Sequence, residues 1–183
     1  MNYEIQQFLE SSEQSVEIGD WRYRYALRHG NPLCYAQRPV VFCMLNPSTA
    51  TAGADDPTIH RLKGFARRWK CDSLNVVNLY AIRSTNPKWV KGYDDPVGAL
   101  NDEVIAAVAR WSRHIVVAWG THAGALRAAH VTKLMVSSGA SLVCLGQNND
   151  GSPKHPLYLA STTSLLPYQC EPPQPSPPKS ICL

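Results

Sequence analysis

The chain contains runs of consecutive, mostly apolar residues at positions 40–45, 74–79, 115–119 and 142–145. Polar residues do not alternate regularly through these runs, as they would in a strand with one solvated face. Such runs are typical of strands that are buried on both faces, as in a parallel sheet. The sequence therefore predicts four buried parallel strands.

One further segment has the opposite pattern. Residues 21–27 (WRYRYAL) alternate aromatic or apolar residues with arginine, which is the period of a half-buried strand. A turn signal with glycine and proline follows at residues 29–32. We expect this strand to pair antiparallel at one edge of the sheet. We also expect Trp21, Tyr23 and Tyr25 to pack within the fold rather than to form a stacking platform.

Helical patterns separate the buried runs. An Asp-Asp-Pro sequence at positions 55–57 is a strong helix start, because aspartate caps a first turn and proline is tolerated in it. The helix that it opens extends over residues 58–70, with an apolar face and a mostly basic opposite face. Two more helices are predicted over about 99–111 and 122–136, the last of them with Thr121 as its cap.

Strands that alternate with helices indicate an α/β fold. We expect a three-layer α/β/α sandwich whose mostly parallel central sheet has about four strands plus an antiparallel edge strand, joined by right-handed crossovers. Residues 20–168 are expected to form this single domain. Residues 1–19 are predicted to be a short helix or a loose arm, and the proline-rich residues 169–183 a disordered or extended tail.

The composition narrows the possible partners and compartment of the protein but does not indicate a function. The chain has 183 residues, of which 44% are hydrophobic and 17% charged, with a formal net charge of +4. This mild positive balance is compatible with an anionic partner and does not require one. No apolar run approaches the roughly 20 residues that cross a bilayer, and the polar, acidic N-terminus lacks a secretory signal, so we expect a cytoplasmic protein without a membrane partner. The six cysteines form no Cys-x-x-Cys pair, which favours reduced thiols and no metal site.

Polar residues follow each of the predicted strands at its carboxyl end, where ligands bind in open α/β sheets. After the first strand come Asn46, Pro47, Ser48 and Thr49, and after the second come Asn78 and Tyr80. After the third come Trp119, Gly120 and Thr121, and after the fourth come Lys154, His155, Pro156 and Leu157. Each group alone is compatible with an ordinary turn. Because parallel strands bring all four groups to one edge, we predict that together they form a ligand site.

Other features rank lower as site candidates. The basic face of the 58–70 helix is typical of a solvated surface, although it would suit phosphate contacts. Asp55 and Asp56 are most simply helix caps, and a role in holding water or metal is secondary. The sequence has no Walker loop, no Gly-x-Gly-x-x-Gly and no Gly-x-Ser-x-Gly motif, which weakens ATPase, dehydrogenase and hydrolase-elbow interpretations.

Two resemblances extend this interpretation. The motifs LNPSTA, DDPTIHR, VVNLYAIR, VAWG and GSPKHPLYL resemble a bacterial and phage family of unknown function, over about residues 20–160. The same layout is similar to the uracil-DNA glycosylase superfamily. In that comparison Asn46-Pro47 resembles the Asn-Pro of the first motif, Asn78 the base-reading asparagine, VAWG the Leu-Trp-Gly segment, and His155-Pro156 the start of the second motif. Met44 and Ser48 stand where the mismatch-specific branch has glycines, and Leu157 stands where the second motif has serine.

The glycosylase resemblance implies a role for each matched residue. Asn46 would position the attacking water, and Asn78 would read the base while Tyr80 stacks on it. His155 would hydrogen-bond the departing base as negative charge builds, and Leu157 would wedge the base stack open. The expected function is thus a nucleobase-recognising, glycosylase-like enzyme that hydrolyses an N-glycosidic bond in DNA or a nucleotide, without a cofactor. The alternative is a non-catalytic nucleic-acid or nucleotide-binding module that uses the same pocket. A nucleotide-modifying transferase would need a second co-substrate site.

Overall fold

The computed structural model describes all residues except 1, 12, 14, 31–37, 49–52 and 170–183. Nearly all of the predicted tail over 169–183, and Thr49 of the predicted site, lie outside the described residues. Among the six cysteines, the structure describes Cys43, Cys71 and Cys144, which are free thiols. Within the described part of the chain, no helix combines the length and apolar character that crossing a membrane requires.

One mixed sheet of seven strands forms the centre of the fold, in the order β1-β2-β4-β3-β5-β6-β7. The four predicted apolar runs form its parallel strands, which are β3 (Pro39–Met44), β4 (Ser73–Asn78), β5 (His114–Val117) and β6 (Ser141–Cys144). Three antiparallel strands complete the sheet, namely β1 (Ser15–Gly19), β2 (Arg24–Gly30) and β7 (Leu166–Pro167). The four predicted parallel strands are present, but the sheet has seven strands where about five were expected, because β1 and β7 were not predicted.

The prediction of a single antiparallel edge strand over residues 21–27 is wrong in place and extent. Strand β2 begins at Arg24, lies between β4 and β1, and is therefore not an edge. The carboxylate of Asp20 explains the later start, because its Oδ1 accepts hydrogen bonds from the backbone N–H groups of Arg22 and Tyr23, each at 2.7 Å, and holds a turn there. Trp21 consequently lies in the turn and is 87% exposed, so the expectation that it packs within the fold is also wrong.

The three predicted helices are present, as α2 (Pro57–Arg68), α3 (Asn101–Ser112) and α4 (Ala125–Ser137). Asp56 caps α2 as predicted, because its Oδ1 accepts from the backbone N–H of Ile59 at 2.8 Å. Thr121 does not cap α4, which begins after Gly124 without a side-chain cap. Two short 3-10 helices, η1 (Val90–Gly92) and η2 (Pro156–Tyr158), lie in the loops.

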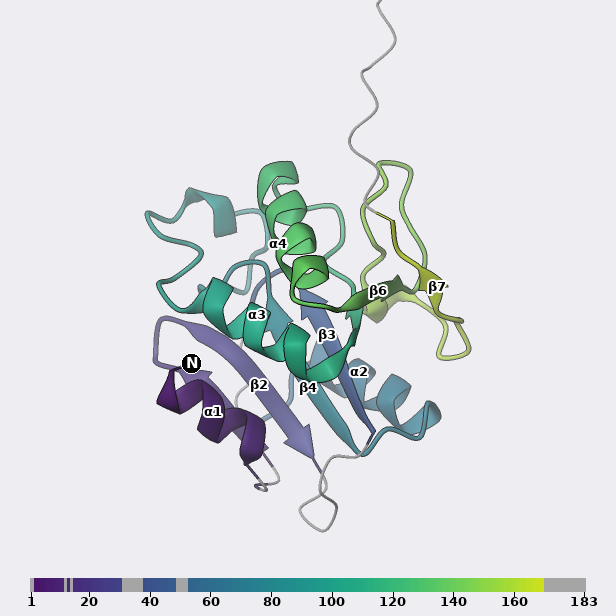
Figure 1. Ribbon diagram of the computed structural model, residues 1–183. Coiled ribbons are helices and arrows are strands. Elements are labelled where there is room, and N and C mark those ends of the chain that lie inside the picture. Colours follow the sequence, from purple (N-terminus) through teal and green to yellow (C-terminus); the bar gives the residue numbers. More distant parts are fainter. Residues whose placement is uncertain (1, 12, 14, 31–37, 49–52, 170–183) are drawn as a thin grey trace, which may run out of the picture.

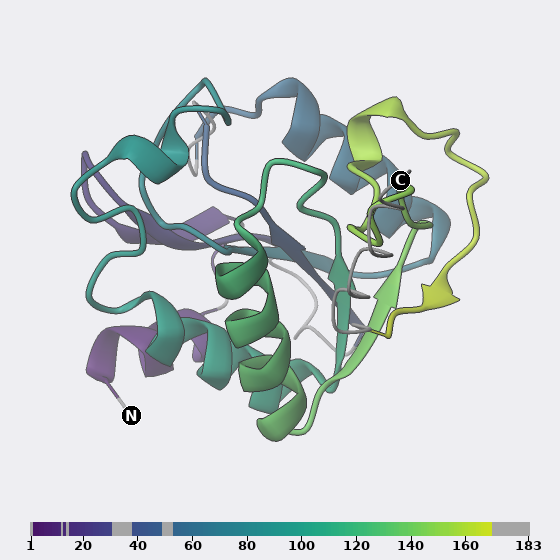
Figure 2. The ribbon, with the colours of Figure 1, turned by 90° about the horizontal axis from the view of Figure 1, so that it is seen from above.

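The helices cover both faces of the sheet, which gives three layers. Helix α2 packs on one face through Ile59, Leu62 and Phe65. Helices α3 and α4 cover the other face together with α1 (Tyr3–Glu10), as Figures 1 and 2 show. The N-terminal segment is thus a helix followed by an edge strand.

The order of the strands creates a crevice between two neighbours in the sheet. The chain leaves the end of β3 through α2 towards β4, and it leaves the end of β5 through α4 towards β6, on the opposite side. Because these two connections diverge, the space beyond the carboxyl ends of β3 and β5 stays open. In α/β folds this switch point is where ligands bind.

The packing of α1 provides a test of whether the N-terminal helix is integral to the domain. Phe8 is 2% exposed, and the guanidinium of Arg28 lies 4.8 Å from the centre of its ring. We expect Phe8→Ala to lower the free energy of unfolding by about 3–5 kcal/mol, because it leaves a cavity beneath the sheet. Tyr3→Ala, which removes a 73% exposed ring from the same helix, is the control and should change stability by less than about 0.5 kcal/mol. Equal denaturation midpoints for the two variants would show that α1 is not part of the cooperative unit.

Candidate functional site

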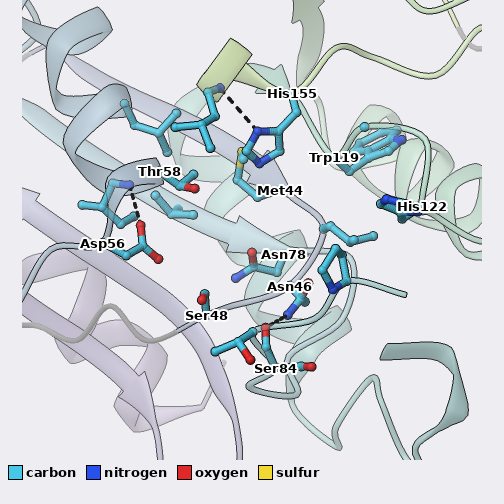
Figure 3. Close-up of a pocket in the computed structure, with 18 of the residues that line it drawn as sticks. Met44, Asn46, Ser48, Asp56, Thr58, Asn78, Ser84, Trp119, His122 and His155 are labelled. Atoms are coloured by element: carbon cyan, nitrogen blue, oxygen red, sulfur yellow. Dashed lines mark hydrogen bonds between the residues drawn. The ribbon is translucent and has the colours of Figure 1, made fainter. Parts of the chain in front are cut away.

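A pocket of about 410 Å³ opens at the switch point, beyond the carboxyl ends of the parallel strands. It is lined by residues from the ends of β3, β4 and β5, the start of α2, and the loop that leads into η2 (Figure 3). Eight residues that were predicted for the site line it: Asn46, Ser48, Asn78, Trp119, Gly120, Thr121, His155 and Leu157.

Of the other predicted residues that the structure describes, none is in the lining of this pocket. Tyr80 is 5% exposed and packs in the core on the α3 side, where its hydroxyl accepts from the backbone N–H of Gly124 at 3.3 Å. Lys154 is exposed and Pro156 is buried at the start of η2, so both lie beside the wall rather than in it. Pro47 is also outside the lining, and its carbonyl oxygen accepts hydrogen bonds from Asn46 and Ser84 within the loop.

Asn46 joins the loops that follow β3 and β4. Its side-chain Nδ2 donates to the carbonyl oxygens of Pro47 and Ser84, at 2.8 Å each, and Ser84 in turn donates its backbone N–H to the carbonyl of Pro47 at 2.9 Å. An asparagine amide has two hydrogens to donate, and both are used here. The Oδ1 atom is therefore the part of the Asn46 side chain that remains to accept a hydrogen bond from a ligand or water.

Asn78 has an unused donor, whereas Asn46 has an unused acceptor. It is the last residue of β4 and only 1% exposed, yet it lines the pocket. Its Nδ2 is buried and has no hydrogen-bond partner among the described residues. A buried donor without a partner costs about 1–3 kcal/mol. The Asn78 amide is therefore a donor beside the pocket whose hydrogen-bonding capacity no described residue uses.

His155 presents a donor in a defined tautomer. Its Nδ1 accepts from the backbone N–H of Leu157 at 3.3 Å, so in the neutral ring the proton lies on Nε2. Burial lowers the pKa of His155 below its ordinary value of 6.5, and the negative charge of Asp56 opposes this shift. The ring is therefore neutral near pH 7, with an N–H to donate.

Two charged residues of the pocket were absent from the predicted site. Asp56 was recognised as a helix cap, but it lines the pocket as well, because the N-terminus of α2 forms one wall. Arg24 is 2% exposed and lines the pocket from β2. Burial lowers the pKa of Arg24 to about 10, so it stays charged at neutral pH. No sequence pattern indicated Arg24, because its position depends on the pairing of β2 with β4.

The electrostatic coupling between Asp56 and His155 can be tested without a substrate. We expect NMR titration to give His155 a pKa below 6.5, and Asp56→Asn to lower it further, because the opposing negative charge is removed. Asparagine caps helices as well as aspartate does, so α2 should keep its start.

Asp55→Asn is the matched control for this titration. The Asp55 carboxylate lies 3.4 Å from Nε2 of His29 and raises the pKa of that histidine against the effect of its burial. We expect Asp55→Asn to lower the pKa of His29 and to leave His155 unchanged. A His155 pKa above 6.5, or one that does not respond to Asp56→Asn, would contradict the charge state given for the site.

Comparison with known proteins identifies a family but no activity. A family model described as "Protein of unknown function (DUF1643)" matches residues 24–157. None of the curated proteins and none of the solved structures gives a match. The matched segment runs from Arg24 in β2 to Leu157 in η2, and it includes most of the residues that line the pocket. The chain therefore belongs to this family of proteins of unknown function.

Proposed function

We propose that this protein is a nucleobase-recognising, glycosylase-like enzyme that hydrolyses an N-glycosidic bond in DNA or in a nucleotide. The observation that carries the proposal is the buried, unpartnered amide of Asn78 in a pocket that also holds the oxygen of Asn46 and the Nε2–H of His155. Each of the three comes from a different strand end or loop. A planar ligand with a carbonyl oxygen, such as a nucleobase, would satisfy such a set.

The dimensions and polarity of the pocket support a small ligand of this kind. Its volume of about 410 Å³ lies within the range of small-molecule sites, and Met44, Ile59 and Trp119 give it apolar surface beside the polar groups. The amide of Asn78 can donate to an exocyclic oxygen on a base edge. Glycosylases recognise an extruded base through hydrogen bonds to its edge.

The chemistry follows from where charge develops. In N-glycosidic hydrolysis the bond from C1′ to the base nitrogen breaks, the base leaves with the electron pair, and the sugar becomes cationic. Water then adds to C1′ and loses a proton, and the departed base anion takes up a proton to become neutral. The Nε2–H of His155 would donate to the base oxygen as negative charge accumulates on it. The Oδ1 of Asn46 would accept a hydrogen bond from the water, and the Asp56 carboxylate would stabilise the cationic sugar.

The order of the site residues along the chain supports the resemblance to the uracil-DNA glycosylase superfamily. Asn46 follows the first parallel strand, Asn78 ends the next, and His155 follows the last, as the resemblance implies. Leu157 is 37% exposed in the pocket wall, which suits a side chain that enters a base stack. We propose a uracil-DNA-glycosylase-like fold and DNA or a nucleotide as partner on this basis.

A second candidate is a non-catalytic binding module that uses the same pocket. Helix α2 begins in the pocket wall, and exposed basic residues lie along its outer face and just beyond its end: His60, Arg67, Arg68 and Lys70. A nucleic acid held by this face would bind less tightly as the salt concentration rises, and the protein would release no base.

The direct test is a base-release assay read by mass spectrometry. The substrates are single- and double-stranded oligonucleotides with uracil, hypoxanthine or mismatched thymine, and free nucleotides. We expect release from at least one substrate and a loss of about 100-fold or more in His155→Ala and in Asn46→Ala, because each removes a group that acts on developing charge or on water.

His114→Ala is the matched control for the assay. His114 is exposed at the start of β5, which is the opposite end of this strand from the pocket, so its removal should leave the rate unchanged. Full activity in both pocket variants would refute the assigned roles. If no substrate releases a base and binding weakens with salt, the binding module is the correct function.

A further inference from the structure

A wider groove of about 720 Å³ adjoins the pocket. Ser48, Ser84 and Thr85 line both cavities, so the two lie side by side along the loops that follow β3 and β4. A polymer with one residue in the pocket would therefore extend its neighbouring residue into this groove. The kind of ligand that fits the groove therefore indicates the kind of substrate that fits the pocket.

Exposed aromatic side chains distinguish the groove. Trp21 is 87% exposed, Trp89 is 67% exposed and Tyr93 is 40% exposed, and all three line it. They come from separate parts of the chain, namely the turn before β2 and the two ends of η1. Large aromatic rings that gather on a surface without being buried mark an interaction site.

The backbone beneath these rings is held in place. The Asp20 carboxylate fixes the turn that carries Trp21, through its two hydrogen bonds to backbone N–H groups. Val90 is fully buried and anchors η1 between Trp89 and Tyr93, while the N–H of Gly92 donates to the carbonyl of Trp89 at 2.9 Å. Rigid segments that present exposed rings lose little conformational entropy when a flat ligand stacks on them.

The charges in the groove favour bases over phosphates as its ligand. Its ionisable lining consists of Glu17, Asp20, Arg83 and Tyr93. Arg83 forms an ion pair with Glu17 at 3.0 Å and donates from Nε to the carbonyl of Asp20 at 3.0 Å. Such a surface offers no excess positive charge to a phosphate backbone, whereas its aromatic rings can stack on bases of any sequence.

We propose that this groove, defined by Trp21, Trp89 and Tyr93, stacks the bases next to the nucleotide held in the pocket, so that the preferred substrate is single-stranded nucleic acid. The inference rests on the proposed function, because the pocket must hold a nucleotide. In a duplex the neighbouring bases are already paired and stacked, and they would have to be separated before they could enter the groove.

The test compares the affinities of parent and variant proteins for three probes: a short mixed-sequence single-stranded DNA, the same sequence as a blunt duplex, and the free mononucleotides. We expect Trp21→Ala and Trp89→Ala each to weaken binding of the single strand by roughly 5- to 100-fold, since this is the usual effect of removing one stacking ring. Mononucleotide binding should not change, because a single nucleotide fills only the pocket. Trp89→Phe, which keeps an aromatic ring, should retain most of the parent's affinity for the single strand.

A salt series and a control variant distinguish stacking on the tryptophans from other causes of weaker binding. Because stacking is not ionic, the fold-change between parent and Trp variants should be the same at low and high salt, although the affinity of each falls. Tyr3→Ala, which removes an exposed ring that lines neither cavity, should bind every probe as the parent does.

The outcomes separate the groove from the pocket. If the Trp variants bind the single strand as tightly as the parent, or if the duplex binds as tightly as the single strand, the groove proposal is wrong while the pocket function stands. If the parent forms a dimer that the Trp variants cannot form, and single-strand binding is unaffected, the aromatic face joins two copies of the chain. If the parent binds none of the probes, the groove proposal and the proposed function fail together.

Discussion

Asn101 and Arg127 hold the carboxyl end of β4, and the geometry of the pocket depends on this contact. The side-chain Nδ2 of Asn101, which is fully buried, donates to the carbonyl oxygens of Asn78 and Leu79, at 3.1 Å each. Arg127 adds a hydrogen bond from Nε to the Leu79 carbonyl at 2.7 Å, and its Nη2 forms an ion pair with Asp102 at 2.6 Å. Helices α3 and α4 are thereby tied to the strand end. These contacts fix the backbone of Asn78 at the edge of the pocket, where its side-chain Nδ2 has no partner among the described residues.

A similar principle organises the other walls. Asn46 uses both of its hydrogens on backbone carbonyls, and His155 uses its Nδ1 on the backbone of Leu157. Each side chain is oriented by the main chain and keeps one atom of known polarity for a ligand. Arg24 and Asp56 add opposite charges to the same lining, so the pocket presents oriented polar groups and charges of both signs.

Several features could be predicted because they depend on local pattern. The buried apolar runs became the parallel strands, and the Asp-Asp-Pro sequence became the capped start of α2. The parallel sheet then brought Asn46, Asn78 and His155 to one pocket. These results need only the periodicity of burial and the geometry of strand ends.

Other features depend on contacts that local pattern does not contain. The alternation around Trp21 resembles a strand, but the Asp20 carboxylate holds a turn there. Tyr80 follows a strand end, where the direction of a side chain depends on how the chain bends, and it points into the core on the α3 side. Arg24 reaches the pocket only because β2 pairs with β4. In each case tertiary contacts outweighed the local sequence signal.

In the proposed function, the unpartnered amide of Asn78 reads a nucleobase. The most direct measurement follows the Asn78 side-chain NH₂ signals of ¹⁵N-labelled protein by NMR as free nucleobases and nucleotides are added, with Asn78→Asp to assign them. We predict saturable shifts of these signals with at least one base, because a new acceptor would pair with a donor that has no protein partner. If other pocket signals move with a ligand while the Asn78 amide stays unchanged, Asn78 does not read the ligand and the claim is wrong.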